Sequence, residues 1–179
     1  LALALMQTGK HHEAKNALDK ALEIDPNDKV TFFNLGVMYQ NLSDLDQAEA
    51  SYRRGLQLRP SDAKGHAGLA MILWEHPAKR MEALEELDHA RRLDPLEPAH
   101  DVTKAVFLWY DRGDVHSADA LLRNVLQRLP DYQPAVVRFG ELNMCCMSNI
   151  AEGIRYFERA LQLDPLAHFP RRSLVGGYL

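Results

Sequence analysis

Apolar residues recur along the chain at helical spacing, in paired stretches separated by short polar breaks. In residues 32–39 the apolar positions follow the i, i+3, i+4, i+7 order of one helix face. A polar break at 41–44 comes next, and residues 45–56 repeat the spacing. The pattern predicts a helix–turn–helix hairpin. Its apolar positions are Phe32, Leu35, Gly36, Tyr39, Leu45, Ala48, Tyr52, Gly55 and Leu56.

Five prolines close these helical pairs at steps of 34, 35, 35 and 35 residues. Proline cannot continue a helix, and the residue before it avoids the helical region. The regular spacing predicts one array of repeats over 1–179, with a truncated unit (1–26), full units at about 27–62, 63–97, 98–132 and 133–167, and a half unit (168–179). The prolines are Pro26, Pro60, Pro95, Pro130 and Pro165.

Small residues recur where two helices of a hairpin must approach closely, and large residues stand beside them. A short side chain lets two helix backbones pack tightly, and overfilling such a crossing costs about 1–3 kcal/mol. The sequence therefore predicts interlocking small and large positions in every unit. The small ones are Ala2, Gly36, Ala70, Gly140, Ala14, Ala48, Ala83, Ala118, Gly153, Ala21, Gly55, Ala90 and Ala160, and the large ones are Leu18, Tyr52, Leu87, Leu122 and Phe157.

Composition narrows the function classes. The 179 residues are 46% hydrophobic and 26% charged, which is a foldable mixture. With 21 basic and 25 acidic side chains, the net charge of −4 argues against nucleic acid as a partner, because nucleic-acid binding needs a basic stripe. No apolar run reaches the roughly 20 residues of a membrane span. Both ends fall within helical patterns, so we expect a piece of a longer protein.

The spacing of Phe32, Leu35-Gly36, Tyr39, Ala48, Tyr52, Gly55 and Pro60 resembles the tetratricopeptide repeat signature, and it recurs across nearly the whole chain. The resemblance implies an all-α fold, an α-solenoid of stacked antiparallel helix hairpins that forms a right-handed superhelix. It also implies a scaffold whose first helices line a concave groove for a peptide, helix or tail of a partner protein.

The resemblance places the groove residues at fixed positions of each first helix. These positions hold a mixture of amides, aromatics, methionine and charges, which suits protein binding. Trp74 is expected at the groove edge as an anchor, whereas Trp109 is expected in the core. The predicted groove residues are Asn34, Val37, Asn41, Lys64, Met71, Trp74, His100, Lys104, Phe107, Tyr110, Arg138 and Glu141.

Four of these residues would form a mildly basic stripe, which favours an acidic partner segment. They are Lys64, His100, Lys104 and Arg138. The carboxylate clamp of the family's chaperone-binding branch is broken, because Leu3 and Gly68 replace its asparagine and arginine. The asparagine ladder of the sugar-transferring branch is also absent, since Gly68 follows Asn34 at the corresponding position.

Two alternative functions stay open. The array would serve as an arm of a bacterial envelope protein for polysaccharide export or pilus assembly, or as a targeting arm of a larger enzyme such as a glycosyltransferase. Exposed apolar ends would also allow end-to-end self-association. The sequence does not distinguish the cytoplasm from the bacterial periplasm.

The sequence shows no pattern typical of a catalytic site, a metal site or a cofactor site, so we expect a non-enzymatic protein. His11-His12 is expected in the first hairpin turn, exposed to solvent. Adjacent helical residues point about 100° apart, so a strain-free bridge between Cys145 and Cys146 is not expected. The two are expected to be buried or half-buried thiols; the alternatives are a vicinal redox pair and a soft-metal site.

Overall fold

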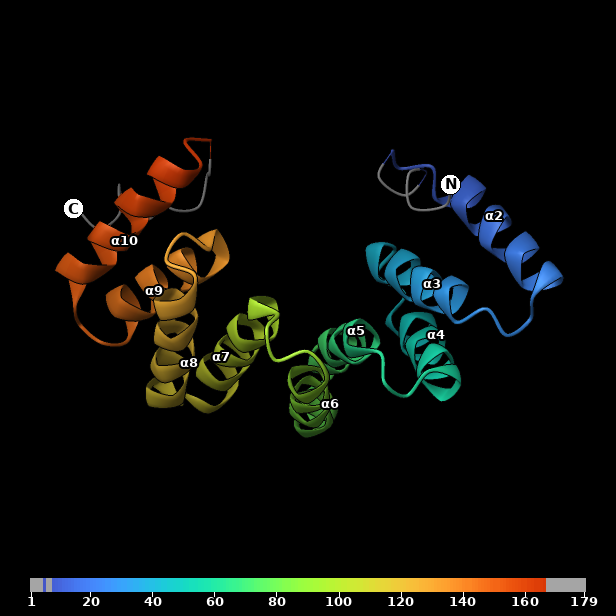
Figure 1. The fold of residues 1–179 in the computed structure, drawn as a ribbon, viewed down its shortest axis with the longest axis horizontal. Helices are drawn as coiled ribbons and strands as arrows, with labels where there is room; N and C mark the ends of the chain where they lie inside the picture. The colour runs from blue at the N-terminus through green and yellow to red at the C-terminus, as the bar shows by residue number, and fades with distance from the viewer. Residues whose placement is uncertain (1–4, 6–7, 167–179) are drawn as a thin grey trace. The chain divides into compact units, whose positions relative to one another are not determined.

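The computed structural model describes Leu5 and residues 8–166, and it divides into two compact units, 1–96 and 97–179 (Figure 1). The described part of the first unit contains α2 (His11–Ile24), α3 (Lys29–Asn41), α4 (Leu45–Leu58), α5 (Ala63–Trp74), the 3-10 turn η1 (Pro77–Lys79) and α6 (Arg80–Leu93). The described part of the second unit contains α7 (Pro98–Arg112), α8 (Val115–Arg128), α9 (Gln133–Cys145) and α10 (Ile150–Leu163).

Consecutive helices pair into hairpins. The closest pairings are α3 with α4, α5 with α6, α7 with α8 and α9 with α10. The first helices of neighbouring hairpins also touch, α3 with α5 in the first unit and α7 with α9 in the second. All secondary structure in the described residues is helical, so the all-α solenoid prediction is confirmed. The single array over 1–179 stays a prediction, and its half unit and Ala2 lie outside the described residues.

Aspartate or asparagine side chains fix where many of the helices begin. Asp28 accepts hydrogen bonds from the backbone amides of Val30 and Thr31 at the start of α3. Such a cap satisfies amides that have no partner inside the helix and contributes about 1 kcal/mol. The same role falls to Asp44, Asp62, Asp114 and Asn149.

The five regularly spaced prolines act as predicted. The residue before each one has left the helical region, as at Asp25 (φ −133°, ψ 96°) and Asp164 (φ −141°, ψ 96°). Each of these residues still donates its amide to the last helical turn, so every second helix ends in the same way. The others are Arg59, Asp94 and Leu129.

The predicted interlocking of small and large residues is present in the described residues. A Cβ added to Gly36 would lie 2.8 Å from the ring of Tyr52, and one added to Gly55 would lie 2.4 Å from the ring of Phe33. Both glycines are needed because an aromatic ring occupies the space of a side chain. The large positions Leu18, Tyr52, Leu87, Leu122 and Phe157 are all buried.

One local expectation needs correction. α2 begins at His11, so the His11-His12 pair lies in the first turn of a helix and not in the hairpin turn. The turn between α5 and α6 contains η1, whose proline stands at its first position. A short 3-10 turn packs one more residue between two helices without lengthening the open loop.

Candidate protein-binding faces

In the first unit, the candidate face consists of side chains from α3 and α5. Asn34, Val37 and Asn41 follow one another at helical spacing on α3, with Asn41 exposed and the other two half-buried. On α5, Lys64 is exposed and Met71 retains 47% of its accessible surface. An apolar side chain that is half exposed on a first helix leaves surface for a partner to cover.

Trp74, the predicted anchor, ends α5 and is half-buried. The guanidinium carbon of Arg80 lies 5.2 Å from the centre of its ring, within cation–π distance. Arg80 also donates from Nε to the carbonyl oxygen of Trp74, at 3.3 Å. Arg80 therefore holds one side of the indole in place at the end of the helix.

In the second unit, α7 and α9 carry the predicted positions. Tyr110 is 63% exposed, and Lys104 is half-buried. His100 and Phe107 retain only 5% and 6% of their surface, and Glu141 retains 8%. The exposed aromatic surface of this face is therefore that of Tyr110, while His100 and Phe107 lie beneath the surface of the described chain.

The pKa of Tyr110 is raised overall by its surroundings. Burial raises the pKa of the Tyr110 phenol, the Glu141 carboxylate raises it further, and the Arg138 guanidinium opposes both. Arg138 donates from Nη1 to Oε2 of Glu141 at 2.7 Å. Because Arg138 is paired on its own helix, the predicted basic stripe loses part of its attraction for an acidic segment.

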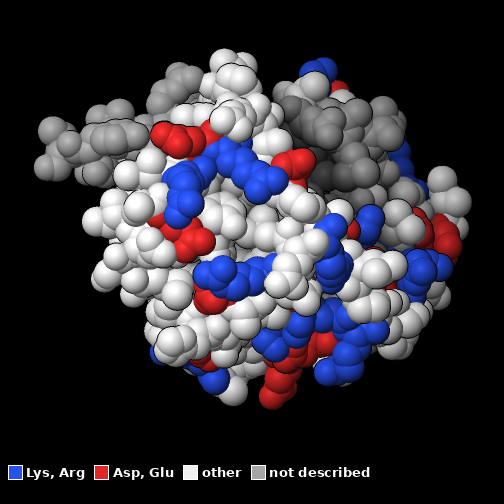
Figure 2. Space-filling view, turned by 60° about the vertical axis from the view of Figure 1, so that its left-hand side comes forward, with Lys and Arg blue, Asp and Glu red and all other residues white. Residues whose placement is uncertain are grey.

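Basic and acidic side chains are also mixed over a wider surface. On the face shown in Figure 2, blue Lys and Arg side chains lie beside red Asp and Glu side chains, with apolar and neutral surface between them. Such mixing agrees with the near balance of 21 basic and 25 acidic residues. It suits recognition of a protein segment that combines apolar and charged groups.

Cys145 and Cys146 differ from the sequence-based expectation, because both are exposed. Their sulfur atoms lie 2.7 Å apart, and Nε1 of Trp109 donates to Sγ of Cys146 at 2.9 Å. The prediction of buried or half-buried thiols was wrong. It treated both cysteines as interior helical residues, whereas α9 ends at Cys145. The indole itself is 9% exposed and lies in the core, as predicted.

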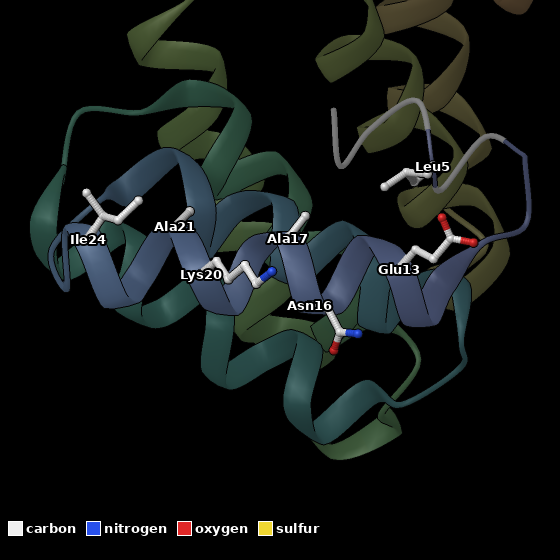
Figure 3. A pocket seen from close by; sticks show the side chains of 7 residues that line it. All are labelled: Leu5, Glu13, Asn16, Ala17, Lys20, Ala21 and Ile24. Carbon is white, nitrogen blue, oxygen red and sulfur yellow. The ribbon is translucent and has the colours of Figure 1, made fainter.

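One pocket of the described chain was not predicted from the sequence. It measures about 570 Å³ and opens along one face of α2 (Figure 3). Ile24, at the end of this helix, is 87% exposed. A run of small and apolar residues on the outer face of a second helix would have indicated it. The lining residues are Leu5, Glu13, Asn16, Ala17, Lys20, Ala21 and Ile24.

Two further classes of feature are absent from the described part of the chain. No group of three or more His, Cys, Asp or Glu side chains there is arranged to hold a metal ion. None of the helices of the described residues combines the length and apolar character that crossing a bilayer requires.

Comparison with known proteins agrees with the geometry of these hairpins. Residues 1–28 and 30–62 match family models described as tetratricopeptide repeat. The chain thus contains tetratricopeptide repeats, as the sequence predicts.

Two curated proteins show sequence similarity. A TPR repeat-containing protein of Pseudomonas aeruginosa, PA4667, is 27% identical over 134 residues, which is 75% of this chain and 22% of that protein. The human protein O-mannosyl-transferase TMTC3 is 25% identical over 173 residues, 92% of this chain and 18% of that protein. The chain thus spans about a fifth of the length of these relatives.

Two solved structures share the fold. The type IV pilus biogenesis factor PilW superposes with a TM-score of 0.82 at 20% identity, covering 93% of this chain and 76% of that one. YrrB, described as a TPR protein with an unusual peptide-binding site, gives 0.68 at 17% identity, covering 96% and 87%. The tetratricopeptide repeat fold is that of a protein–protein interaction scaffold, and repeats of this kind are generally non-catalytic.

Proposed function

We propose that the chain binds a peptide, helix or tail of a partner protein on the first-helix faces of its hairpins. The observation that carries the proposal is the exposure of large apolar side chains on these helices, 47% for Met71 and 63% for Tyr110. Aromatic and methionine side chains are the usual anchors of protein interfaces. The likeness to YrrB supports a peptide as the ligand class.

The predicted preference for an acidic segment would depend on Lys64, which is exposed on α5. Lys104 is half-buried on α7, and the guanidinium of Arg138 already contacts Glu141. An acidic preference predicts affinity that falls as salt increases, since exposed charges are screened over about 8 Å at physiological ionic strength.

Selection from a random peptide library tests the proposal directly. Peptides that bind the wild-type chain are then measured against Met71→Glu and Tyr110→Glu, which place a charge on each candidate face. We expect at least one of these changes to weaken binding about tenfold or more. Peptides that bind both variants as tightly as the wild type would contradict the proposal.

As matched controls, glutamate is introduced at exposed apolar positions of second helices. Met81→Glu alters α6, where Met81 is 57% exposed, and Ile150→Glu alters α10, where Ile150 is 52% exposed. Both should leave peptide affinity within about twofold of the wild type. Helical circular dichroism of all four variants separates loss of binding from loss of fold.

Two wider functions are favoured by particular comparisons. The fold shared with PilW supports a role in a bacterial envelope or pilus assembly protein. The similarity to TMTC3 supports an arm of a larger glycosyl-transferring enzyme. The sequence of the gene on both sides of this segment separates them, because a transferase domain supports the second and a secretion signal with envelope domains supports the first.

A further inference from the structure

The end of α9 brings two neighbouring thiols together. Cys145 is the last residue of the helix, and Cys146 has left it with φ −125° and ψ −28°. This change of direction is what allows the two sulfur atoms to lie 2.7 Å apart, although adjacent side chains inside a helix diverge. Both residues are exposed, so a small molecule in solvent can reach the pair.

Two hydrogen-bonding groups lie beside Sγ of Cys146. Nε1 of Trp109 donates to Sγ of Cys146 at 2.9 Å, and the neighbouring thiol of Cys145 lies within hydrogen-bond distance of the same atom. Burial raises the pKa of the Cys145 thiol, and the hydrogen bond and charge of Cys146 raise it further. The Cys145 thiol therefore holds its proton more tightly than an ordinary thiol does.

We propose that Cys145 and Cys146 form a redox site that low-molecular-weight disulfides oxidise reversibly to an intrachain disulfide. The thiolate of Cys146 attacks one sulfur of the small disulfide, which releases one small thiolate and leaves a mixed disulfide on Cys146. The thiolate of Cys145 then attacks Sγ of Cys146 and releases the second small thiolate. The chain loses two hydrogen atoms in all, and one small disulfide becomes two thiols.

The second step becomes easier once the first has occurred. In the mixed disulfide, Sγ of Cys146 carries neither a proton nor a negative charge. Two of the causes that raise the pKa of the Cys145 thiol, the hydrogen bond to Cys146 and its charge, are thereby removed. The short distance between the sulfurs then favours ring closure over a second attack from solution.

The bridge is readily reopened because its geometry is unfavourable. Consecutive Cα atoms are about 3.8 Å apart, whereas disulfides usually join Cα atoms separated by about 4.4–6.8 Å. A disulfide under strain is reduced more easily, and exposed or strained disulfides are the labile ones. The pair is thus suited to a change that small thiols can reverse.

Oxidation of the two thiols would also alter the surroundings of Trp109 and Tyr110 on α7. The sulfur that accepts the indole hydrogen of Trp109 would become a disulfide sulfur, and the indole ring lies 4.6 Å from that of Tyr110, centre to centre. An effect on peptide binding rests on the proposed function, whereas the chemistry of the bridge and the response of Trp109 do not.

The test uses the whole chain, which contains no other cysteine. In a Trp74→Phe background, Trp109 is the remaining tryptophan and its emission reports on the site. The chain is incubated with oxidised glutathione and followed by intact mass and fluorescence, and reduced glutathione is then added. Cys145→Ser and Cys146→Ser serve as matched variants, with circular dichroism to confirm the fold.

We expect loss of two hydrogen atoms without a retained glutathione, a change in Trp109 emission, and reversal of both by reduced glutathione. Cys145→Ser should retain one glutathione. Cys146→Ser should acquire one glutathione severalfold more slowly than Cys145→Ser does. Two glutathiones on each chain, disulfide-linked dimers, an unmodified chain, or a bridge that leaves Trp109 emission unchanged would each overturn the proposal.

Discussion

The ring of Tyr52 on α4 occupies the space in which any side chain at Gly68 on α5 would begin. A Cβ placed on Gly68 would lie 2.4 Å from Cε1 of Tyr52 and 2.9 Å from its hydroxyl oxygen. Gly68 stands where the carboxylate clamp of the family carries an arginine. At this one position of the clamp a larger side chain is excluded, because Tyr52 of the preceding hairpin occupies the space.

In other repeats the sequence pairs a smaller residue on the second helix with a larger residue on the next first helix. Where the second helix carries leucine at the position of Tyr52, as at Leu18 and Leu122, the next first helix carries a longer side chain, Asn34 or Arg138. A smaller residue on one helix thus leaves space for a larger residue on the next. Tyrosine at position 52 leaves no space for a side chain at Gly68.

Substitution of Gly68 tests this relationship. Gly68→Ala should lower the free energy of unfolding by about 1–3 kcal/mol, because the ring of Tyr52 must move. Urea denaturation measures the change. In a Tyr52→Leu background the same substitution should be close to neutral, and an equal loss in both backgrounds would show that Tyr52 is not the obstacle.

The titration of Tyr52 should make stability depend on alkaline pH. Burial raises the pKa of this phenol to about 12, so the folded chain holds the proton more tightly than the unfolded chain does. The stabilisation is complete below the unfolded pKa of about 10 and is lost as pH rises towards 12, by on the order of 2 kcal/mol. Denaturation at pH 9 to 11, compared with Tyr52→Phe, isolates this contribution. Parallel curves for the two chains would contradict it.

An ion-pair network joins α4 to η1 and α6. Glu49 accepts from Arg53 at 3.0 Å and from Lys79 at 2.7 Å, and Arg53 also contacts Glu82 at 2.7 Å. Burial alone would raise the pKa of Glu49, but hydrogen bonds from Lys79 and Arg53 and their charges lower it overall. The carboxylate therefore stabilises neighbouring hairpins in its ionised form.

Replacing Glu49 should remove that contribution. A depressed pKa stabilises the fold above the unfolded value of about 4.5, and the benefit disappears as pH falls through the folded value. Glu49→Gln should lower the free energy of unfolding by about 1 kcal/mol at pH 7 and by less at pH 3. Glu85→Gln, an exposed change on α6, is the control. A loss of the same size at both pH values would indicate that Glu49 stabilises the fold through packing and not through its charge.

Self-association through the outer face of α2 is a further prediction. Ile24 is 87% exposed beside the open pocket of that helix. Sedimentation of the wild-type chain should show an increase in mass with concentration that Ile24→Asp reduces, since a buried charge opposes an apolar contact. Ile150→Asp, at the start of α10, should leave the association unchanged. A wild-type chain that stays monomeric at all concentrations would exclude this contact.

The fold was predictable because local signals repeat. The residues before the prolines end helices, aspartates begin them, and small residues such as Gly36 face large ones such as Tyr52. Each signal acts over a few residues, so sequence spacing is sufficient to place the hairpins. The boundary at Leu96 between the two compact units had no such signal.

The candidate site was less accessible to sequence reasoning, because its properties depend on pairing and burial. Position in the repeat placed Arg138 on a first helix, but not its contact with Glu141. It did not indicate the burial of His100 and Phe107 either. The approach of the two thiols depends on the residue at which α9 ends, and helix ends are the least regular feature of a repeat.

The adjacency of Cys145 and Cys146 has a thermodynamic consequence. A crosslink stabilises a fold chiefly by restricting the unfolded chain, and the effect grows with the number of residues that it encloses. No residue lies between these two cysteines, so a bond between their sulfur atoms removes almost no conformational entropy from the unfolded chain. Restriction of the unfolded chain would therefore contribute almost nothing to the stability of the oxidised protein.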